Sequence, residues 1–512
     1  MRASTALLLL TLLQGCHAIL SLDERGADGP PPLDTGADAG DLAGVADALP
    51  DLPGIQDTTL DGTPLDVTPA PDLGLRPAGT THAWSNRYGN DGQEAVNAVA
   101  VDSSGNIYVT GGFKGTVDFG GKALTSSSQL RDIFVASYKP DGDLRWVKSF
   151  GLATSSQVGK ALDATGAGVV LVTGDAEIGI DLGNGPEPGQ GGTEAFLLAL
   201  TQSGGGHVWS RLIGSTGHDR GDAVAVDAVG NVYVTGQIWG DASYGGPVIK
   251  AATNDDIFVA SYDKNGSYRW ARRFGSAGKD EGRGVAVGAG VVYVTGFFDG
   301  QINLGSGIKT NVKYNDVFVV ALKPTVPATP LWDKTFGSTW YDTGIAVTVD
   351  ASDNVYATGE VQGPVDFGGG KSGPSDTLSD AFVASFDKSG GHRWSKVFGG
   401  SGSDGGKSVA LDAPGNVVVG GYYKGSFTLD AKALNSNQGS TDVLIASFTP
   451  AGGVRWIEGF GGAGTDFCNG VAVDSASNLY AVGPFEQTVS FGGKPLTATG
   501  QPPDIFLVKL AP

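Results

Sequence analysis

The sequence predicts an all-β fold built from seven similar units, and the first observation behind this prediction is the recurrence of tryptophan. Seven tryptophans follow one another at intervals of 61 to 63 residues: Trp84, Trp146, Trp209, Trp270, Trp332, Trp394 and Trp456. A fixed period of this length is the signature of a repeat architecture. No segment shows a helical period, and 83 glycines and 25 prolines interrupt every candidate helix.

Each repeat contains the pattern of four short strands. The tryptophan strand ends in an aromatic residue and a glycine, as at 146–151, and a valine-rich strand follows, as at 99–101. A turn rich in glycine and asparagine leads to a second strand at 107–111, because these residues tolerate the positive φ of hairpin turns. A short V-D-F-G element at 117–120 precedes a third strand at 132–135, which opens with an acidic residue.

The third strands are apolar on both faces, since Ile133 and Val135 point one way and Phe134 and Ala136 the other. Such strands are buried on both sides, as in a propeller blade covered by its neighbours. The repeats begin with a tryptophan strand and end after a third strand, so the first strand must complete the last blade and remove the open edge. We therefore predict a seven-bladed β-propeller of four-stranded blades over residues 82–512.

The repeat resembles the SBBP β-propeller repeat family. The matching features are the acid before phenylalanine in the third strand, the glycine after the tryptophan strand, and a VAVD-x-x-GN-x-YVTG stretch, as at 99–111. The resemblance covers residues 82–512 and implies a fold more than a function. Copies two and four depart from the pattern: Ala167-Gly168 replaces the turn asparagine, Gly288 stands where an aspartate is expected, and the loop 323–330 is longer and proline-rich.

Residues 1–15 predict a lipoprotein signal peptide. Arg2 precedes an apolar run at 6–13, which is too short to span a bilayer as a permanent helix. The run ends in Leu-Gln-Gly-Cys16, which resembles a bacterial lipoprotein signal and implies that Cys16 is lipidated and anchors the chain to a membrane. The alternative is an ordinary secretory signal with an incidental cysteine. His17, in place of aspartate, favours the outer membrane or cell surface of a bacterial envelope over the inner membrane.

Residues 16–81 predict a flexible acidic tether. The segment contains eleven aspartates and Glu24 but only two basic residues, Arg25 and Arg76, so it carries about half of the net charge of −20. Such a segment lacks the apolar content that offsets the entropy of ordering. The acidic composition argues against a nucleic-acid partner. Cys468 is the only other cysteine, so the mature domain contains no disulfide, and we expect this thiol to be buried.

Two acidic residues recur in the repeats. The first stands five positions after the glycine of the tryptophan strand, with Ser156 as the exception in copy two: Glu94, Asp219, Asp280, Asp342, Asp404 and Asp466. The closed ring should gather these carboxylates near the channel mouth. The second opens the third strand: Asp132, Glu194, Asp256, Asp316, Asp380, Asp442 and Asp504. Regular recurrence favours a structural role as acceptors of backbone N–H groups, and the alternative is a rim site for a cation or a basic ligand.

The connections from strand four to strand one and from strand two to strand three share one face, and they vary between copies. Variable loops on a rigid scaffold are the usual place for binding. The candidate contacts are side chains that occur in one copy only: Trp340, Tyr341, His218, Phe467 and Trp239. An exposed aromatic beside an acid suits carbohydrate or peptide, with packing as the alternative. Calcium suits Asp/Gly-rich loops, but no segment has the full EF-hand spacing, and no other cofactor is expected.

The sequence lacks the motifs H-E-x-x-H and G-x-S-x-G and any phosphate-binding glycine loop, and it contains five histidines. We therefore expect a non-catalytic cell-envelope lipoprotein that displays a propeller as a binding scaffold for a protein or polysaccharide partner. The alternative is a carbohydrate-active or other hydrolytic enzyme that uses the rim carboxylates, which rests on fold analogy. A metal bound only for stability is a third hypothesis.

Overall fold

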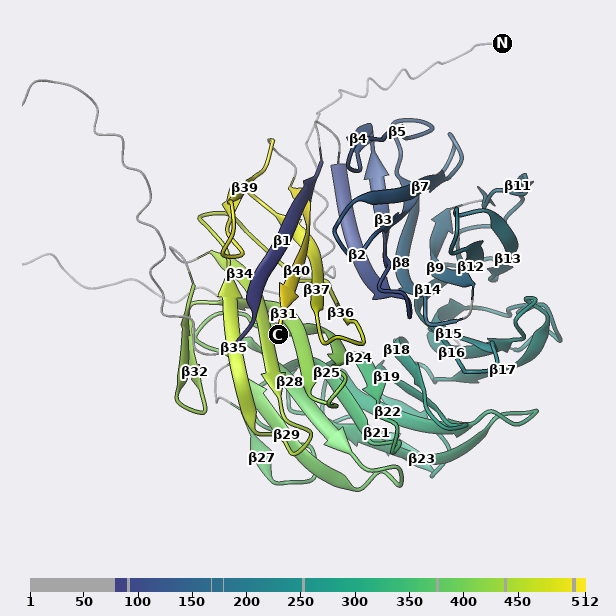
Figure 1. Cartoon of the computed structure of the whole chain (residues 1–512). Helices are drawn as coiled ribbons and strands as arrows, with labels where there is room; N and C mark the ends of the chain where they lie inside the picture. The colour runs from purple at the N-terminus through teal and green to yellow at the C-terminus, as the bar shows by residue number, and fades with distance from the viewer. Residues whose placement is uncertain are drawn as a thin grey trace, which may run out of the picture. The chain divides into compact units, whose positions relative to one another are not determined.

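A computed structural model describes residues 79–89, 93–166, 168–177, 179–250, 254–373, 377–436, 440–499 and 503–512. Seven four-stranded antiparallel sheets follow one another around a ring, which confirms the predicted fold (Figure 1). Within this part of the chain, no helix has the length and apolar character needed to cross a membrane. The predicted signal peptide, Cys16 and almost all of the predicted tether lie outside the described residues, as does Ala167.

The first strand of each blade lies innermost, because it contacts the first strands of both neighbouring blades. These strands are β2 (Gln93–Val101), β8 (Gln157–Asp163), β14 (Arg220–Val226), β18 (Glu281–Val287), β24 (Thr343–Val349), β30 (Gly405–Leu411) and β36 (Gly470–Val473). The first six carry a bulge near their start.

The second and third strands form the centre of each blade and are almost wholly buried, as their two-sided apolar pattern predicts. The second strands are β3 (Ile107–Lys114), β9 (Val169–Glu177), β15 (Val232–Trp239), β19 (Val292–Phe298), β25 (Val355–Gln362), β31 (Val417–Lys424) and β37 (Leu479–Phe485). The third strands are β6 (Asp132–Tyr138), β12 (Thr193–Thr201), β16 (Asp255–Tyr262), β22 (Asp316–Lys323), β28 (Ser379–Phe386), β34 (Thr441–Phe448) and β40 (Asp504–Ala511).

The tryptophan strands are outermost. They are β7 (Leu144–Phe150), β13 (His207–Ile213), β17 (Tyr268–Phe274), β23 (Thr329–Phe336), β29 (His392–Phe398), β35 (Val454–Phe460) and β1 (Thr81–Tyr88). The indole N–H of Trp146 donates to Gln202 O (3.0 Å) in the next blade, and Trp84, Trp209, Trp332 and Trp394 make the equivalent bond. Tryptophan recurs once per repeat because its indole N–H forms a clasp, a hydrogen bond that joins one blade to the next.

Copy four breaks the clasp. The Trp270 indole nitrogen has no acceptor among the described residues, and the carbonyl of Ala328, in the longer proline-rich loop, instead accepts from Arg272. The same copy lacks the turn aspartate, and Asp353 of the next blade compensates by accepting from Ala289 N (2.9 Å).

Short hairpins lie in six of the connections between the second and third strands, and three of them contain the predicted V-D-F-G-like elements, at 117–120, 365–368 and 489–492. The six hairpins are β4 (Thr116–Asp118) with β5 (Ala123–Thr125), β10 (Ile180–Asp181) with β11 (Pro186–Glu187), β20 (Gln301–Asn303) with β21 (Ile308–Thr310), β26 (Val365–Asp366) with β27 (Lys371–Ser372), β32 (Ser426–Leu429) with β33 (Lys432–Asn435), and β38 (Thr488–Val489) with β39 (Leu496–Thr497). In the third blade a single bridge joins Ala242 and Ile249 instead.

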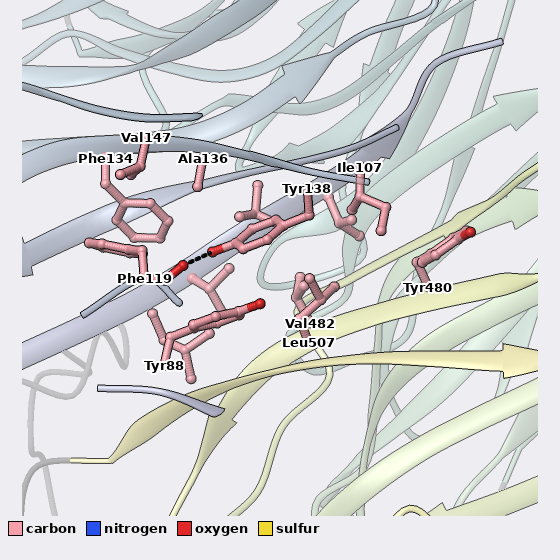
Figure 2. Close-up of a cluster of buried hydrophobic side chains, with 14 of the residues drawn as sticks. Tyr88, Ile107, Phe119, Phe134, Ala136, Tyr138, Val147, Tyr480, Val482 and Leu507 are labelled. Atoms are coloured by element: carbon pink, nitrogen blue, oxygen red, sulfur yellow. Dashed lines mark hydrogen bonds between the residues drawn. The ribbon is translucent and has the colours of Figure 1, made fainter. Parts of the chain in front are cut away.

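The ring closes as predicted, because β1 pairs with β40 and becomes the outermost strand of the last blade. β1 begins at Thr81, one residue before the predicted domain start. A shared core joins the last blade to the first: Tyr88 of β1 stacks on Tyr138 of β6 at 5.1 Å, and Tyr480, Val482 and Leu507 of the last blade lie in the same cluster (Figure 2). Packing and strand pairing thus remove the open edge together.

Candidate binding face

The first recurring acid bridges two loops from inside the molecule. Asp342 is wholly buried, and its carboxylate accepts from the backbone N–H of Ser338 (2.5 Å) and of Gln362 (2.9 Å). The same pair of bonds, one in the loop between blades and one at the end of the second strand, occurs at Asp219, Asp280, Asp404 and Asp466. In this structure the five aspartates are not on the surface of the rim, and their backbone bonds agree with the structural interpretation.

Two copies differ from this arrangement. Glu94 is also buried, at 4% exposure, and lies within β2. In copy two the equivalent residue is Gln157 and not Ser156: Gln157 N donates to Arg131 O (2.9 Å), as Asp219 N donates to Thr193 O (2.7 Å). The preceding loop is one residue longer, so counting from the glycine placed the position one residue too early.

The second recurring acid explains the glycine that ends each tryptophan strand. Asp380 and Asp404 both lie against Gly399, where a Cβ atom would overlap the Asp380 carboxylate. Equivalent contacts join Asp132 to Gly151, Asp256 to Gly275, Asp316 to Gly337, Asp442 to Gly461 and Asp504 to Gly89. Each of these glycines therefore leaves room for a buried carboxylate.

Burial raises the pKa of Asp280, Asp316, Asp342 and Asp466 to about 7, while backbone N–H donors oppose the shift. Neighbouring carboxylates add to the effect at three of them: Asp256 beside Asp280, Asp342 beside Asp316, and Asp442 beside Asp466. Removing water from an anion favours its protonated form.

These pKa values predict that the protein is more stable at pH 5 than at pH 8. A carboxyl whose pKa rises from 3.8 unfolded to about 7 folded stabilises the fold fully below about pH 4 and loses that contribution as the pH rises through 7. Thermal unfolding at constant ionic strength measures this, and Asp342→Asn should have a smaller pH dependence. An equal or higher midpoint at pH 8 would contradict the prediction.

One face of the molecule, here called the loop face, carries the connections from the fourth strand of a blade to the first strand of the next, and those from the second to the third strand. The two kinds of connection meet where His218, in the loop before β14, pairs with Thr193 at the start of β12. Three aromatic rings meet on the loop face: the Tyr314 ring lies 6.2 Å from Trp340, with 18° between their planes, and 4.6 Å from Tyr341, with 24°. We call Tyr314, Trp340 and Tyr341 the aromatic platform. The Lys313 ammonium lies 5.0 Å from the Tyr314 centroid and 5.7 Å from that of Trp340.

Buried hydrogen bonds hold the loop that carries two of these rings. The Ser338 hydroxyl donates to Gln362 O (2.6 Å) and accepts from Trp340 N (2.9 Å), while Tyr341 N donates to Gln362 Oε1 (3.4 Å). Together with the bonds to Asp342, these contacts fix the backbone beneath the platform. Trp340 itself remains 39% exposed.

The other predicted aromatic contacts lie apart from the platform. Trp239 is 46% exposed at the end of β15, and His218 contacts the Thr193 hydroxyl (3.3 Å). Phe467 packs edge-on against Tyr422 at 5.2 Å. The structure therefore joins Trp340 and Tyr341 of the predicted set into one cluster. Sequence reasoning missed Tyr314 and Lys313, which come from the connection between β19 and β22, about 26 residues earlier in the chain.

A belt of charged residues on the innermost strands was also missed. Four of its members occupy one variable position near the start of the inner strand, Lys160, Asp222, Arg283 and Lys407, where the other blades have Asn97, Ile345 and Asn469. Ion pairs link blades, as from Lys160 to Asp222 (3.5 Å) and from Arg220 to Glu281 (2.8 Å). Burial opposes ionisation of Glu281, but Arg283, Arg220 and Lys279 outweigh it and lower its pKa to about 2. The sequence signal that could have revealed this belt is the variation of one position within inner strands that otherwise repeat.

No group of three or more histidine, cysteine, aspartate or glutamate side chains in the described part of the chain is arranged to hold a metal ion. Cys468 is buried as expected, and burial raises the pKa of its thiol to about 12. Its sulfur lies against Gly420, at an interface where other blades pair a threonine with a glycine, such as Thr173 with Gly221. The cysteine thus fills the space that the missing threonine leaves.

The sheet order, the clasps and the closure by β1 define this molecule as a seven-bladed β-propeller. Residues 208–241 match the beta-propeller repeat family SBBP, which confirms the resemblance seen in the sequence. The chain is therefore a seven-bladed propeller that carries an SBBP repeat.

A sequence relative is the uncharacterized WD repeat-containing protein L264 of Acanthamoeba polyphaga mimivirus, which is 23% identical. The match covers 79% of this chain, which spans 36% of that relative's length. Similar solved structures include quinohemoprotein alcohol dehydrogenase from Comamonas testosteroni (TM-score 0.38, 11% identity, 84% of this chain and 76% of that one). A europium-containing methanol dehydrogenase is another (TM-score 0.41, 12% identity, 85% and 93%). Similarities of this size say nothing about activity.

Proposed function

We propose that this protein is a non-catalytic scaffold that binds a protein or polysaccharide partner through its loop face. The aromatic platform carries the proposal, because it combines an exposed tryptophan, parallel rings and an ammonium group in one blade only. The recurring residues, in contrast, serve the fold: five of the recurring tryptophans clasp blades and five of the recurring aspartates accept backbone bonds. Exposed aromatic residues that are held rigidly are the groups that dominate binding energies at interfaces.

The second part of the proposal is attachment to a bacterial cell envelope. The motivation is the apolar run before Leu-Gln-Gly-Cys16, and two or more acyl chains on Cys16 would give stable anchoring. Anchoring would present the propeller at a membrane surface, with the outer membrane or cell surface favoured. Release of a Cys16→Ser chain from the membrane fraction would support this part, and unchanged fractionation would contradict it.

A hydrolytic enzyme that uses rim carboxylates is the alternative. It would need two carboxyl groups that reach a substrate from the surface, with one as acid and the other as nucleophile or base. The five aspartates of the first recurring acid are at most 1% exposed, and each accepts two backbone bonds. Their burial therefore favours the scaffold over this alternative.

We predict that a pull-down from envelope extract with the full-length chain captures a partner that a triple variant, Tyr314→Ala with Trp340→Ala and Tyr341→Ala, fails to hold. The physical reason is the loss of the exposed ring surface with little change to the buried bonds beneath it. Val229→Ala is the matched control, because Val229 is 75% exposed in a turn after a first strand, away from the loop face. Equal capture by the wild type and the triple variant would move the binding site elsewhere.

A further inference from the structure

We propose that the aromatic platform binds an acidic polysaccharide, with the exposed Trp340 ring stacked on a pyranose unit and Lys313 paired with a sugar carboxylate. This inference rests on the proposed function, since it names the chemistry of the partner at the same site. The geometry of the rings, the state of the ammonium group and the rigidity of the loop each contribute to it.

The platform offers one exposed ring, that of Trp340 at 39% exposure, because Tyr341 stacks on Tyr314 at 4.6 Å. The Tyr314 and Trp340 planes are within 18° of parallel, and one ammonium group lies over both faces, so the two rings point to the same side. The face of an aromatic ring carries negative partial charge. The C–H bonds on the flat side of a pyranose carry positive partial charge, so a sugar ring fits against such a face both in shape and in electrostatics.

Lys313 selects the charge of the ligand. Among the described residues its ammonium group has ring contacts only, at Tyr314 and Trp340, and neither an ion pair nor a hydrogen bond engages it. An ammonium group donates up to three hydrogen bonds and accepts none. An exposed ammonium group without an ion pair suits a carboxylate.

The loop is organised before the ligand arrives. Buried bonds join Ser338, Asp342 and Gln362 to one another. Ser338 and Gln362 in turn accept from the backbone N–H groups of Trp340 and Tyr341. A preformed site loses less conformational entropy on binding. A proline-rich peptide also uses aromatic surfaces, but it would leave the Lys313 charge without an anionic partner, so the acidic saccharide is the better fit.

The test is isothermal titration of the full-length chain in detergent with three acidic probes, namely oligomers of polygalacturonate, alginate and hyaluronan, and with cellohexaose as the neutral probe. We expect at least one acidic probe to bind more tightly than cellohexaose. Trp340→Ala should weaken that binding at least tenfold, whereas Lys313→Gln should remove the preference for the acidic probe. Trp239→Ala, which also removes an exposed tryptophan from the loop face, is the control and should bind as the wild type does.

Absence of binding by all three acidic probes would overturn the inference, as would equal affinity in the wild type and Trp340→Ala. Lys313 is exposed and free of buried contacts, so Lys313→Gln keeps the test decisive even where Trp340→Ala folds poorly. Capture of a protein by the platform in the pull-down, without saccharide binding, would sink this inference and leave the scaffold proposal standing. Failure of both experiments would overturn both.

Discussion

Excision of Thr81–Tyr88, the whole of β1, from the full-length chain is expected to abolish cooperative unfolding and to cause aggregation. β1 pairs with β40 along the length of that strand, from Thr81 opposite Ala511 to Tyr88 opposite Ile505. Its loss would leave the last blade with three strands and expose the edge of β40, and an exposed strand edge is a template for pairing with other chains.

The excision would also remove contacts that reach beyond β40. Arg87 donates to the buried carboxylate of Asp504 (2.6 Å), and Tyr88 stacks on Tyr138 in the first blade. The shared core in Figure 2 would lose one wall. Leaving Asp504 buried without Arg87 adds a further cost, because an uncompensated buried charge destabilises strongly.

Scanning calorimetry and size-exclusion chromatography measure the outcome. The matched control excises the eight residues 40–47, which are also N-terminal but lie outside the propeller repeats. We expect the control to unfold in the same transition as the intact chain. A β1 excision that stayed monomeric with an unchanged transition would show that the pairing with β40 contributes little to the ring.

The variant Gly236→Ala is expected to lower the free energy of unfolding by about 3 kcal/mol, at the upper end of the cost of overpacking. Gly236 lies on β15 opposite the bulged start of β14, and a Cβ atom there would overlap the backbone carbonyl oxygen of Arg220 and approach Phe258 to 3.0 Å. The Arg220 carbonyl belongs to the backbone of a four-stranded sheet, so it cannot move aside as a side chain could by changing its rotamer.

Equilibrium urea unfolding followed by tryptophan fluorescence measures this cost. Gly204→Ala is the control, since nothing lies within 4 Å of a Cβ atom at that turn, and we expect a change of about 0.5 kcal/mol or less. Similar urea midpoints for the two variants would contradict the prediction, because they would mean that the inner strand shifts at its bulge and makes room for the added methyl group. The overlap recurs in every blade: Gly111 on Ala95, Gly174 on Val158, Gly296 on Glu281, Gly359 on Thr343, Gly421 on Gly405 and Gly483 on Phe467.

The fold was predictable because its information is local and repeated. The tryptophan period set the number of blades, and the turn residues within each repeat marked the ends of the strands. Small errors arose where one copy departs from the rest. The longer loop of copy two moved the buried position from Ser156 to Gln157, which only the backbone bond to Arg131 identified.

The candidate site was predictable in part. Trp340 and Tyr341 were recognisable as residues of one copy on a variable loop, but Tyr314 and Lys313 belong to a different connection. Nothing in the spacing of the chain indicates that their side chains meet those of the loop before β24. The recurring acids had two interpretations, and the distinction depended on burial, which counting along the sequence does not measure.

The sequence by itself determined the all-β class, the seven blades and the closure by the first strand. These follow from strand patterns and turn residues within each repeat of about 62 residues and from the order of strands at the two ends. The tertiary structure decided which carboxylates are buried, which charged residues link the inner strands, and which aromatic rings share one face. Such properties depend on how separate loops approach one another after blades pack, and that packing is set by many side chains at once.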